Sequence, residues 1–284
     1  MEQCDPIGAR LDRLPLSRFH FRIFGIISFS LLITGFLSYS GNVVLAKLVS
    51  NGWSNNYLNA AFTSALMFGY FIGSLTGGFI GDYLGRRKAF RLNLLIVGIS
   101  ACVATFVPNM YWLIFCRCLM GCGMGALIMI GYASFTEFIP PAVRGKWSAR
   151  LSFVGNWSPM LSAAIGIVVI AFLSWRIMFL LGGAAMLLAW YLSGRYFIES
   201  PRWLAGKGQR SAAEKHLQQV ESQIEKEKNI ILPAWQSAEH RAEVGVESGS
   251  FWLLFKGHML RRTLVAITVL IAMNISLYTI TVWI

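Results

Sequence analysis

An arginine lies inside one of the long apolar stretches of this sequence, where a charge is costly. Arg117 stands one helical turn before Gly121, Gly123 and Gly125. A guanidinium at membrane depth costs about 2.5–3.5 kcal/mol on insertion scales, so we expect it to face a cavity or a partner. The alternative is a side chain that reaches outward to the membrane interface, because only about nine residues separate Arg117 from Pro108. The three glycines allow another helix to pack closely.

A charged turn follows another apolar stretch. It carries Gly78, Asp82, Gly85, Arg86 and Arg87 within ten residues. Glycine permits positive φ and lets two helix ends approach closely. We expect the Asp82 carboxylate to accept from backbone N–H groups at the start of a neighbouring helix, and the arginines to stay in the headgroup layer.

Two further charged segments follow later apolar stretches. One holds Glu137, Arg144 and Gly145, and the other holds Glu199 and Arg202. Together with the charges of the first turn, these side chains can form a network on one membrane face. A single exposed ion pair contributes little, but a network that forms in one conformation only can bias a two-state equilibrium. We therefore predict that these residues help to close that face.

The composition limits the class of protein. Hydrophobic residues make up 56% of the 284 residues and charged ones 13%, and the mean hydropathy is +0.57, which predicts an integral membrane protein. The net charge of +12 comes in short clusters between apolar segments, which favours the lipid bilayer over nucleic acid as a partner. The four histidines and five cysteines form no catalytic or metal-binding pattern, so we expect no enzyme activity, no metal and no cofactor.

Seven apolar segments are long enough to cross a hydrocarbon core of ~30 Å as helices, so the expected fold class is an all-α membrane protein. They run over 23–45, 58–80, 92–107, 110–133, 151–173, 177–197 and 263–284. Lys and Arg concentrate in the leading tail and in alternate loops, which predicts a cytoplasmic amino terminus. The expected organisation is a cytoplasmic tail at 1–22, a six-helix transmembrane bundle at 23–197, a central cytoplasmic loop at 198–262 and a seventh transmembrane helix at 263–284.

The central loop contains one helical pattern. Ser211 and Glu214 have the spacing of a capping box, and Leu217, Val220 and Ile224 follow at helical intervals. This pattern predicts a short amphipathic helix on the cytoplasmic surface. The chain ends in an apolar run without a polar flank, from which we expect a truncated product or fragment.

Four elements resemble those of the major facilitator superfamily, in its sugar-porter and metabolite:proton symporter branch. G-x-x-x-D-x-x-G-R-[RK] matches residues 78–87, R-x-x-x-G-x-G-x-G matches 117–125, E-x-x-P-x-x-x-R-G matches 137–145, and E-S-P-R-W-L matches 199–204. The likeness covers essentially the whole chain and is nearest to enterobacterial inner-membrane metabolite transport proteins. It implies a twelve-helix bundle in two halves with the substrate near the midplane. This chain would hold the N-terminal six-helix half, the central loop and the seventh helix, with the missing C-terminal half as its partner.

The resemblance also implies a function. It implies a secondary active transporter for a small metabolite, such as a sugar, a sugar acid or a related organic acid, that works by alternating access and is coupled to protons. Arg117 would lie beside the central cavity. Three positions depart from the family pattern: Tyr83 replaces a basic residue usual in the first turn, Ile198 replaces a proline that precedes Glu199, and Leu37 stands where proton-coupled sugar porters carry an aspartate. No acid falls inside a span, so three alternatives stay open: coupling residues in the missing half, a facilitative uniporter, or Arg117 as the counter-charge of an anionic substrate such as a sugar acid. A non-transporting membrane fragment is a further alternative.

Polar and aromatic side chains within the spans are candidates for binding a hydroxyl-rich substrate. A hydrogen bond between helices, or anchoring at the interface, would explain each of them equally well. In the fifth span, Pro159 is expected to bend the helix. The candidates are Tyr39 and Asn42 in the first span, Asn156 and Trp157 in the fifth, and Asn274 and Tyr278 in the seventh.

Overall fold

The computed structural model describes residues 6–230, 232 and 257–283, which form α-helices and, within these ranges, no β-strands. The chain divides into two compact units, Met1–Trp235 and Gln236–Ile284. The second unit contains α11 (Gly257–Trp283). The first unit contains α1 (Pro6–Asp12), α2 (Arg18–Ser50), α3 (Asn56–Leu84), α4 (Arg86–Ala104), α5 (Met110–Phe138), α6 (Pro141–Gly155), α7 (Ser158–Phe172), α8 (Trp175–Tyr196), α9 (Pro201–Gly206) and α10 (Arg210–Lys228).

Six helical stretches of the described residues are long and apolar enough to cross a membrane. They lie in α2, in α3, in α5, in α6 and α7 taken together, in α8 and in α11. The third expected span corresponds to α4, which has 19 residues but begins with the basic residues Arg86, Arg87 and Lys88 and falls outside this set. The predicted all-α membrane fold is confirmed.

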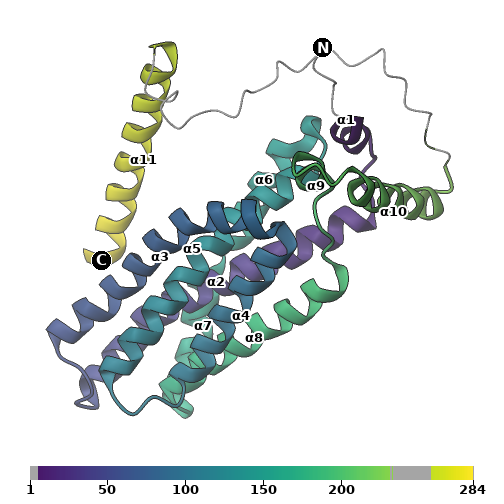
Figure 1. Cartoon of the computed structure of the whole chain (residues 1–284). Helices are drawn as coiled ribbons and strands as arrows, with labels where there is room; N and C mark the ends of the chain where they lie inside the picture. Colours follow the sequence, from purple (N-terminus) through teal and green to yellow (C-terminus); the bar gives the residue numbers. More distant parts are fainter. Residues whose placement is uncertain (1–5, 231, 233–256, 284) are drawn as a thin grey trace. The chain divides into compact units, whose positions relative to one another are not determined.

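Helices α3 and α5 pack along a glycine-lined interface (Figure 1). Gly69, Gly73 and Gly77 recur every four residues and therefore share one face of α3. A Cβ built on Gly69 would lie 2.9 Å from the Cα of Gly121, and one built on Gly77 would lie 2.7 Å from the Cα of Ala126. The two backbones thus approach too closely for larger residues. Such close packing drives helix association in lipid, where burial of apolar surface supplies little.

The three predicted packing glycines of α5 serve two neighbours. A Cβ on Gly121 or Gly125 would meet the backbone of α3, whereas a Cβ on Gly123 would lie 2.5 Å from Cγ2 of Val97 on α4. Residues two apart on an α-helix point ~200° away from each other. The alternating glycines therefore place α5 between two helices.

The fifth span is broken into α6 and α7. Helix α7 begins at Ser158 with Pro159 in its first turn. At the expected bend the regular helix lapses at Asn156 and Trp157, because the proline supplies no N–H to the preceding turn. A Cβ built on Gly35 of α2 would overlap the side chain of Ser158, and one built on Gly166 would lie 2.6 Å from Cγ1 of Val43. Helices α2 and α7 therefore run parallel and in contact.

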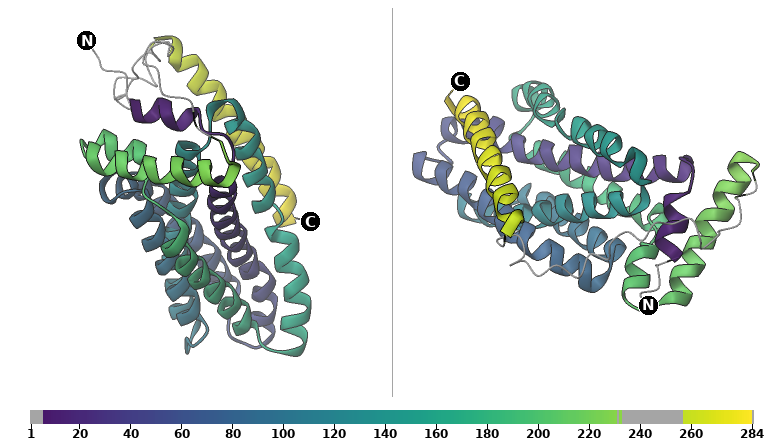
Figure 2. Two further views of the ribbon diagram at one scale, coloured as in Figure 1. Left: turned by 90° about the vertical axis from the view of Figure 1, so that its right-hand side faces the viewer. Right: turned by 90° about the horizontal axis from the view of Figure 1, so that it is seen from above.

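Helices α1, α9 and α10 gather at one end of the first unit, which we call the charged end (Figures 1 and 2). Helix α1 lies in the segment expected to be a tail, and α2 begins at Arg18, inside that same segment. Ile7 and Leu11 of α1 are buried, as is Leu14 directly after it. This apolar face fixes α1 to the rest of the unit.

Helix α10 buries the apolar face that its sequence predicts, namely Leu217, Val220 and Ile224. The expected capping box is wrong. The helix begins at Arg210 with Gln209 at the N-cap, so Ser211 lies in the first turn and does not cap the helix.

Candidate functional site

Arg117 on α5 is enclosed by α2, α3 and α8 and is only 1% exposed. Its Nη1 donates to the backbone carbonyl of Leu37 at 2.8 Å, and its Nη2 donates to that of Ser38 at 3.1 Å. The guanidinium carbon lies 4.6 Å from the ring centroid of Phe62 on α3 and 6.0 Å from that of Phe179 on α8. The alternative that the Arg117 side chain reaches outward to the membrane interface is therefore wrong. Carbonyl groups of α2 hold its guanidinium inside the bundle.

A glycine on α2 makes room for this guanidinium. A Cβ built on Gly41 would overlap Nη2 of Arg117 and lie 2.9 Å from its Cζ. Among the described residues Arg117 forms no ion pair, and its buried Nε has no hydrogen-bond partner. Carbonyl dipoles carry only partial charges, so the site keeps a net positive charge in surroundings of low dielectric constant. An anion close to it would be stabilised.

Two hydroxyl groups lie beside Arg117. The Oγ of Ser38 and the phenol oxygen of Tyr70 on α3 are 2.8 Å apart, and Ser38 Oγ also donates to the carbonyl of Thr34 at 2.9 Å. Both side chains are half-buried, unlike the enclosed arginine. Sequence analysis overlooked this pair, because single hydroxyl residues in a span are common and only the fold brings these two to Arg117.

The other candidates of the first unit lie on two helices that pack together. Tyr39 is half-buried and Asn42 is exposed on α2, while Asn156 and Trp157 are at the break between α6 and α7. Helical periodicity places Tyr39 and Asn42 on the face of Gly35, and that face contacts the start of α7. The fold thus puts the four side chains on adjoining elements.

The two candidates of the seventh helix belong to the second unit. Asn274 is exposed, and its Nδ2 donates to the carbonyl of Leu270 at 2.8 Å. The side chain of Tyr278 is outside the described part of the chain. A shared binding wall between these residues and the first unit stays a prediction.

At the charged end, Arg86 joins three helices. Its Nη1 lies 2.7 Å from Oδ1 of Asp82 at the end of α3, and its Nε lies 2.9 Å from Oε1 of Glu137 on α5. The Nε1 of Trp203 on α9 donates to the backbone carbonyl of Asp82 at 2.9 Å. The structure thus brings together three of the residues proposed for the charge network and adds Trp203, which sequence analysis did not use.

Glu199, rather than Asp82, occupies the start of α4. The Oε1 of Glu199 accepts from the backbone N–H of Arg87 at 3.1 Å, and the positive end of the helix dipole favours this carboxylate. The expected role of Asp82 is therefore wrong, because its carboxylate pairs with the side chain of Arg86. Gly85 has φ of 95°, and a Cβ there would lie 2.5 Å from Oε2 of Glu199. Only glycine suits both the conformation and the space.

Arg144 and Arg202 meet at a carboxylate that sequence analysis overlooked. The Oδ1 of Asp12 accepts from Nη2 of Arg202 and lies 3.9 Å from Nη2 of Arg144. The sequence predicted one network that included Glu137 and Glu199. In the structure these residues form separate contacts: Glu137 pairs with Arg86, and Glu199 caps α4. The residue that receives the two remaining arginines comes from α1, where no local pattern marks it.

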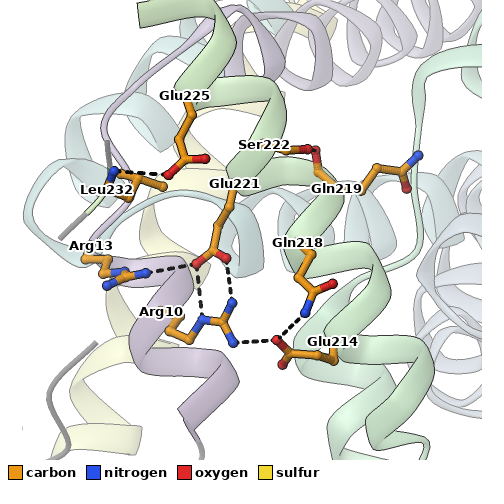
Figure 3. Close-up of polar contacts among 9 residues, drawn as sticks. All are labelled: Arg10, Arg13, Glu214, Gln218, Gln219, Glu221, Ser222, Glu225 and Leu232. Carbon is orange, nitrogen blue, oxygen red and sulfur yellow. Dashed lines mark hydrogen bonds and ion pairs between the residues drawn. The ribbon is translucent and has the colours of Figure 1, made fainter. Parts of the chain in front are cut away.

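Two arginines hold α1 against α10 (Figure 3). The Nη2 and Nε of Arg10 donate to Oε2 and Oε1 of Glu221 at 2.5 and 3.1 Å, and its Nη1 donates to Oε1 of Glu214 at 2.6 Å. Arg13 adds a bond to Glu221 at 3.0 Å. The hydrogen bond from Arg10 lowers the pKa of Glu214, and the bond to Glu221 raises the pKa of Arg10. Paired bonds between a guanidinium and a carboxylate are among the stronger polar contacts.

Two motif glycines have no crowded neighbour. Nothing lies within 4 Å of a Cβ built on Gly78 or on Gly145, so packing in this structure does not explain glycine at either position. The described residues also contain no group of three or more His, Cys, Asp or Glu side chains that could hold a metal ion.

These features define a multi-pass membrane protein whose helices pack around an enclosed cation and are tied together at one end by ion pairs. The sequence profile of the Major Facilitator Superfamily matches residues 26–284, and the chain belongs to this family. The family assignment agrees with the resemblance of the four sequence elements.

Individual relatives are longer than this chain. It is 82% identical over 284 residues to the inner membrane metabolite transport protein YdjE of Escherichia coli K12, covering 100% of this chain and 63% of that protein. It is 40% identical over 280 residues to the putative metabolite transport protein YdjK of the same strain, covering 97% of this chain and 60% of that protein. The chain thus spans about three fifths of the length of these relatives.

The fold is also similar to a solved transporter. The xylose transporter XylE of E. coli, in a partially occluded inward-open conformation, matches with a TM-score of 0.63 and 19% identity, covering 75% of this chain and 57% of that chain. At this level of identity the likeness shows a common fold.

Proposed function

We propose that this chain takes part in secondary active transport of a small metabolite across an inner membrane, by alternating access. The observation that carries the proposal is Arg86, which joins α3, α4 and α5 through Asp82 and Glu137. Such ion pairs can form in one conformation and break in another, so they can bias an equilibrium between two states of the transporter. Membership of the family and the names of its relatives support the same function.

The amino terminus lies in the cytoplasm in this proposal. The charged end carries the basic clusters of the first unit, including the run Arg86 to Lys88 at the start of α4 and Arg144 in α6. Basic residues near the ends of spans remain on the cytoplasmic side of a membrane. Helices α1, α9 and α10 would then face the cytoplasm.

The substrate is a sugar, a sugar acid or a related organic acid. Arg117 is enclosed in this structure, and its charge lacks a carboxylate partner among the described residues, so it would favour an acidic group nearby through its electric field. The polar side chains on the adjoining elements α2, α6 and α7 would bind hydroxyl groups. They are Tyr39, Asn42, Asn156 and Trp157.

Proton coupling is the proposed energy source, with facilitative uniport as the second candidate. Leu37 favours uniport, since a leucine there offers no titratable group to the neighbouring Arg117. A proton site in a membrane requires such a group in or beside the cavity. The coupling residue is therefore expected in the part of the transporter that this chain does not contain.

Uptake by cells that lack related transporters tests the proposal. The chain is expressed alone and together with the C-terminal segment of YdjE that it does not cover, and labelled sugars, sugar acids and organic acids are supplied with and without a proton gradient. We expect uptake from the combination, and its loss on Arg86→Gln but not on Lys88→Gln, since Lys88 is exposed on the same turn. Absence of flux from every combination would leave a non-transporting membrane protein.

A further inference from the structure

We propose that Asp12 is a positioning residue of the charge network that closes the membrane face at the charged end. It holds Arg144 of α6 and Arg202 of α9 together. The N-terminal helix α1 thereby contributes a residue to the conformational change of the transporter. This inference rests on the proposed transport function and identifies a residue that controls it.

The contacts of Asp12 link elements that are far apart in sequence. Its Oδ1 accepts from Nη2 of Arg202, and the same Nη2 donates to the backbone carbonyl of Gly8 at 3.3 Å. Nη2 of Arg144 lies 3.9 Å from the same Oδ1 and donates to the carbonyl of Ile139 at 3.4 Å. One carboxylate oxygen therefore connects the beginning of the fifth span to the helix that follows the sixth.

The single negative charge of Asp12 lies between the two positive charges of Arg144 and Arg202. The side chains of Asp12, Arg202 and Arg144 are 19%, 26% and 35% exposed, so water screens them only in part. The Nε atoms of both arginines are buried without a hydrogen-bond partner among the described residues. If Asp12 were neutral, two guanidinium groups would face each other across it, and their repulsion would separate α6 from α9.

The docking of α1 on α10 is made by other residues than Asp12. Arg10 binds Glu214 and Glu221, and Ile7 and Leu11 are buried. A variant that neutralises Asp12 should therefore leave α1 docked on α10. The bridge, by which we mean the contacts of Asp12 with Arg144 and Arg202, can therefore be disturbed without disturbing the docking of α1 on α10.

Hydrogen exchange of this chain in lipid nanodiscs tests the bridge. For Asp12→Asn we expect exchange of α9 and of α6 to rise about two- to fivefold, the range of a partly exposed ion pair, with α10 unchanged. Asp12→Glu should restore the slower exchange, because it keeps the charge. The matched control is Glu214→Gln, which removes a carboxylate from the contact with α1 but leaves Asp12 in place; it should raise exchange in α1 and α10 only.

The uptake assay with the YdjE segment tests the link to transport. Asp12→Asn should change the maximal rate about two- to fivefold, because it shifts the balance of conformations. Unchanged exchange in α6 and α9, or altered exchange with an unaltered maximal rate, would overturn the inference. If the unmodified combination shows no uptake, the proposed function fails, whereas the exchange experiment still decides whether the bridge exists.

Discussion

Arg117 donates from Nη1 to the backbone carbonyl of Leu37 at a distance of 2.8 Å. The side chain of the same leucine is fully buried and faces α8, where a Cβ built on Gly182 would lie 3.2 Å from its Cδ1. The main chain of Leu37 therefore binds the Arg117 guanidinium, and its side chain packs against α8. Helix α2 supplies carbonyl dipoles at this point, and the guanidinium retains its charge inside the bundle.

The space for this guanidinium should be sensitive to one methyl group. Gly41→Ala is expected to destabilise the protein by about 1–3 kcal/mol, the usual effect of overpacking, because the added Cβ would overlap Nη2 of Arg117. Gly25→Ala on the same helix is the control, since nothing lies within 4 Å of its Cβ; helix propensity predicts a gain of up to about 1 kcal/mol there. Thermal unfolding in detergent measures both, and equal shifts would contradict the crowding.

A second prediction concerns the charge of Arg117. If it binds the acidic group of a substrate, Arg117→Gln should reduce uptake of acidic solutes by tenfold or more, because a hydrogen bond to a charged group contributes roughly 1.5–3 kcal/mol. Neutral solutes should be affected less. Arg117→Lys keeps the charge and should retain part of the acidic uptake. Uptake by chain and YdjE segment together is the measurement, and an equal loss for both classes of solute would argue for a structural role only.

The glycines of α3 should differ sharply in how well they tolerate substitution by alanine. A Cβ on Gly73 would lie 2.9 Å from the Cα of Cys122 and closer still to its carbonyl, whereas Gly78 has open space around it. Gly73→Ala is expected to cost about 1–3 kcal/mol, because backbone atoms cannot move aside as a flexible side chain can. Gly78→Ala should be near neutral. Unfolding midpoints in detergent compare the two, and a larger loss for Gly78→Ala would require a role for that glycine in another conformation.

The docking of α1 should weaken in acid. Arg10 lowers the pKa of Glu214 below its ordinary value of 4.5. A carboxyl group with a lowered pKa in the folded state stabilises the fold above its unfolded pKa, and this contribution is lost as the pH falls through the folded value. Arg10, whose pKa is raised, stays charged throughout. Exchange of α1, corrected for the chemical effect of pH, should therefore rise only below pH 4.5.

The matched variant for this experiment is Glu214→Gln. It should show faster exchange of α1 at neutral pH and a smaller rise in acid, because one of the two carboxylate partners of Arg10 is gone. An identical pH profile in both proteins would mean that other groups control the docking.

The sequence alone determined the membrane class and the approximate position of the spans. Spans are recognisable because a run of apolar residues is a local property, and Arg117 stands out because charge is rare in such a run. The charged turn also contains both Asp82 and Arg86, and the structure pairs them across the junction of α3 and α4.

Tertiary structure decided which groups meet. Arg117 finds carbonyls of α2, the hydroxyl pair of Ser38 and Tyr70 forms between α2 and α3, and Asp12 receives two arginines from distant segments. None of these contacts follows from local pattern, because a hydrogen bond or ion pair depends on the direction of a side chain and on the helix that packs beside it. Those are set by close packing of whole helices, which no single segment contains.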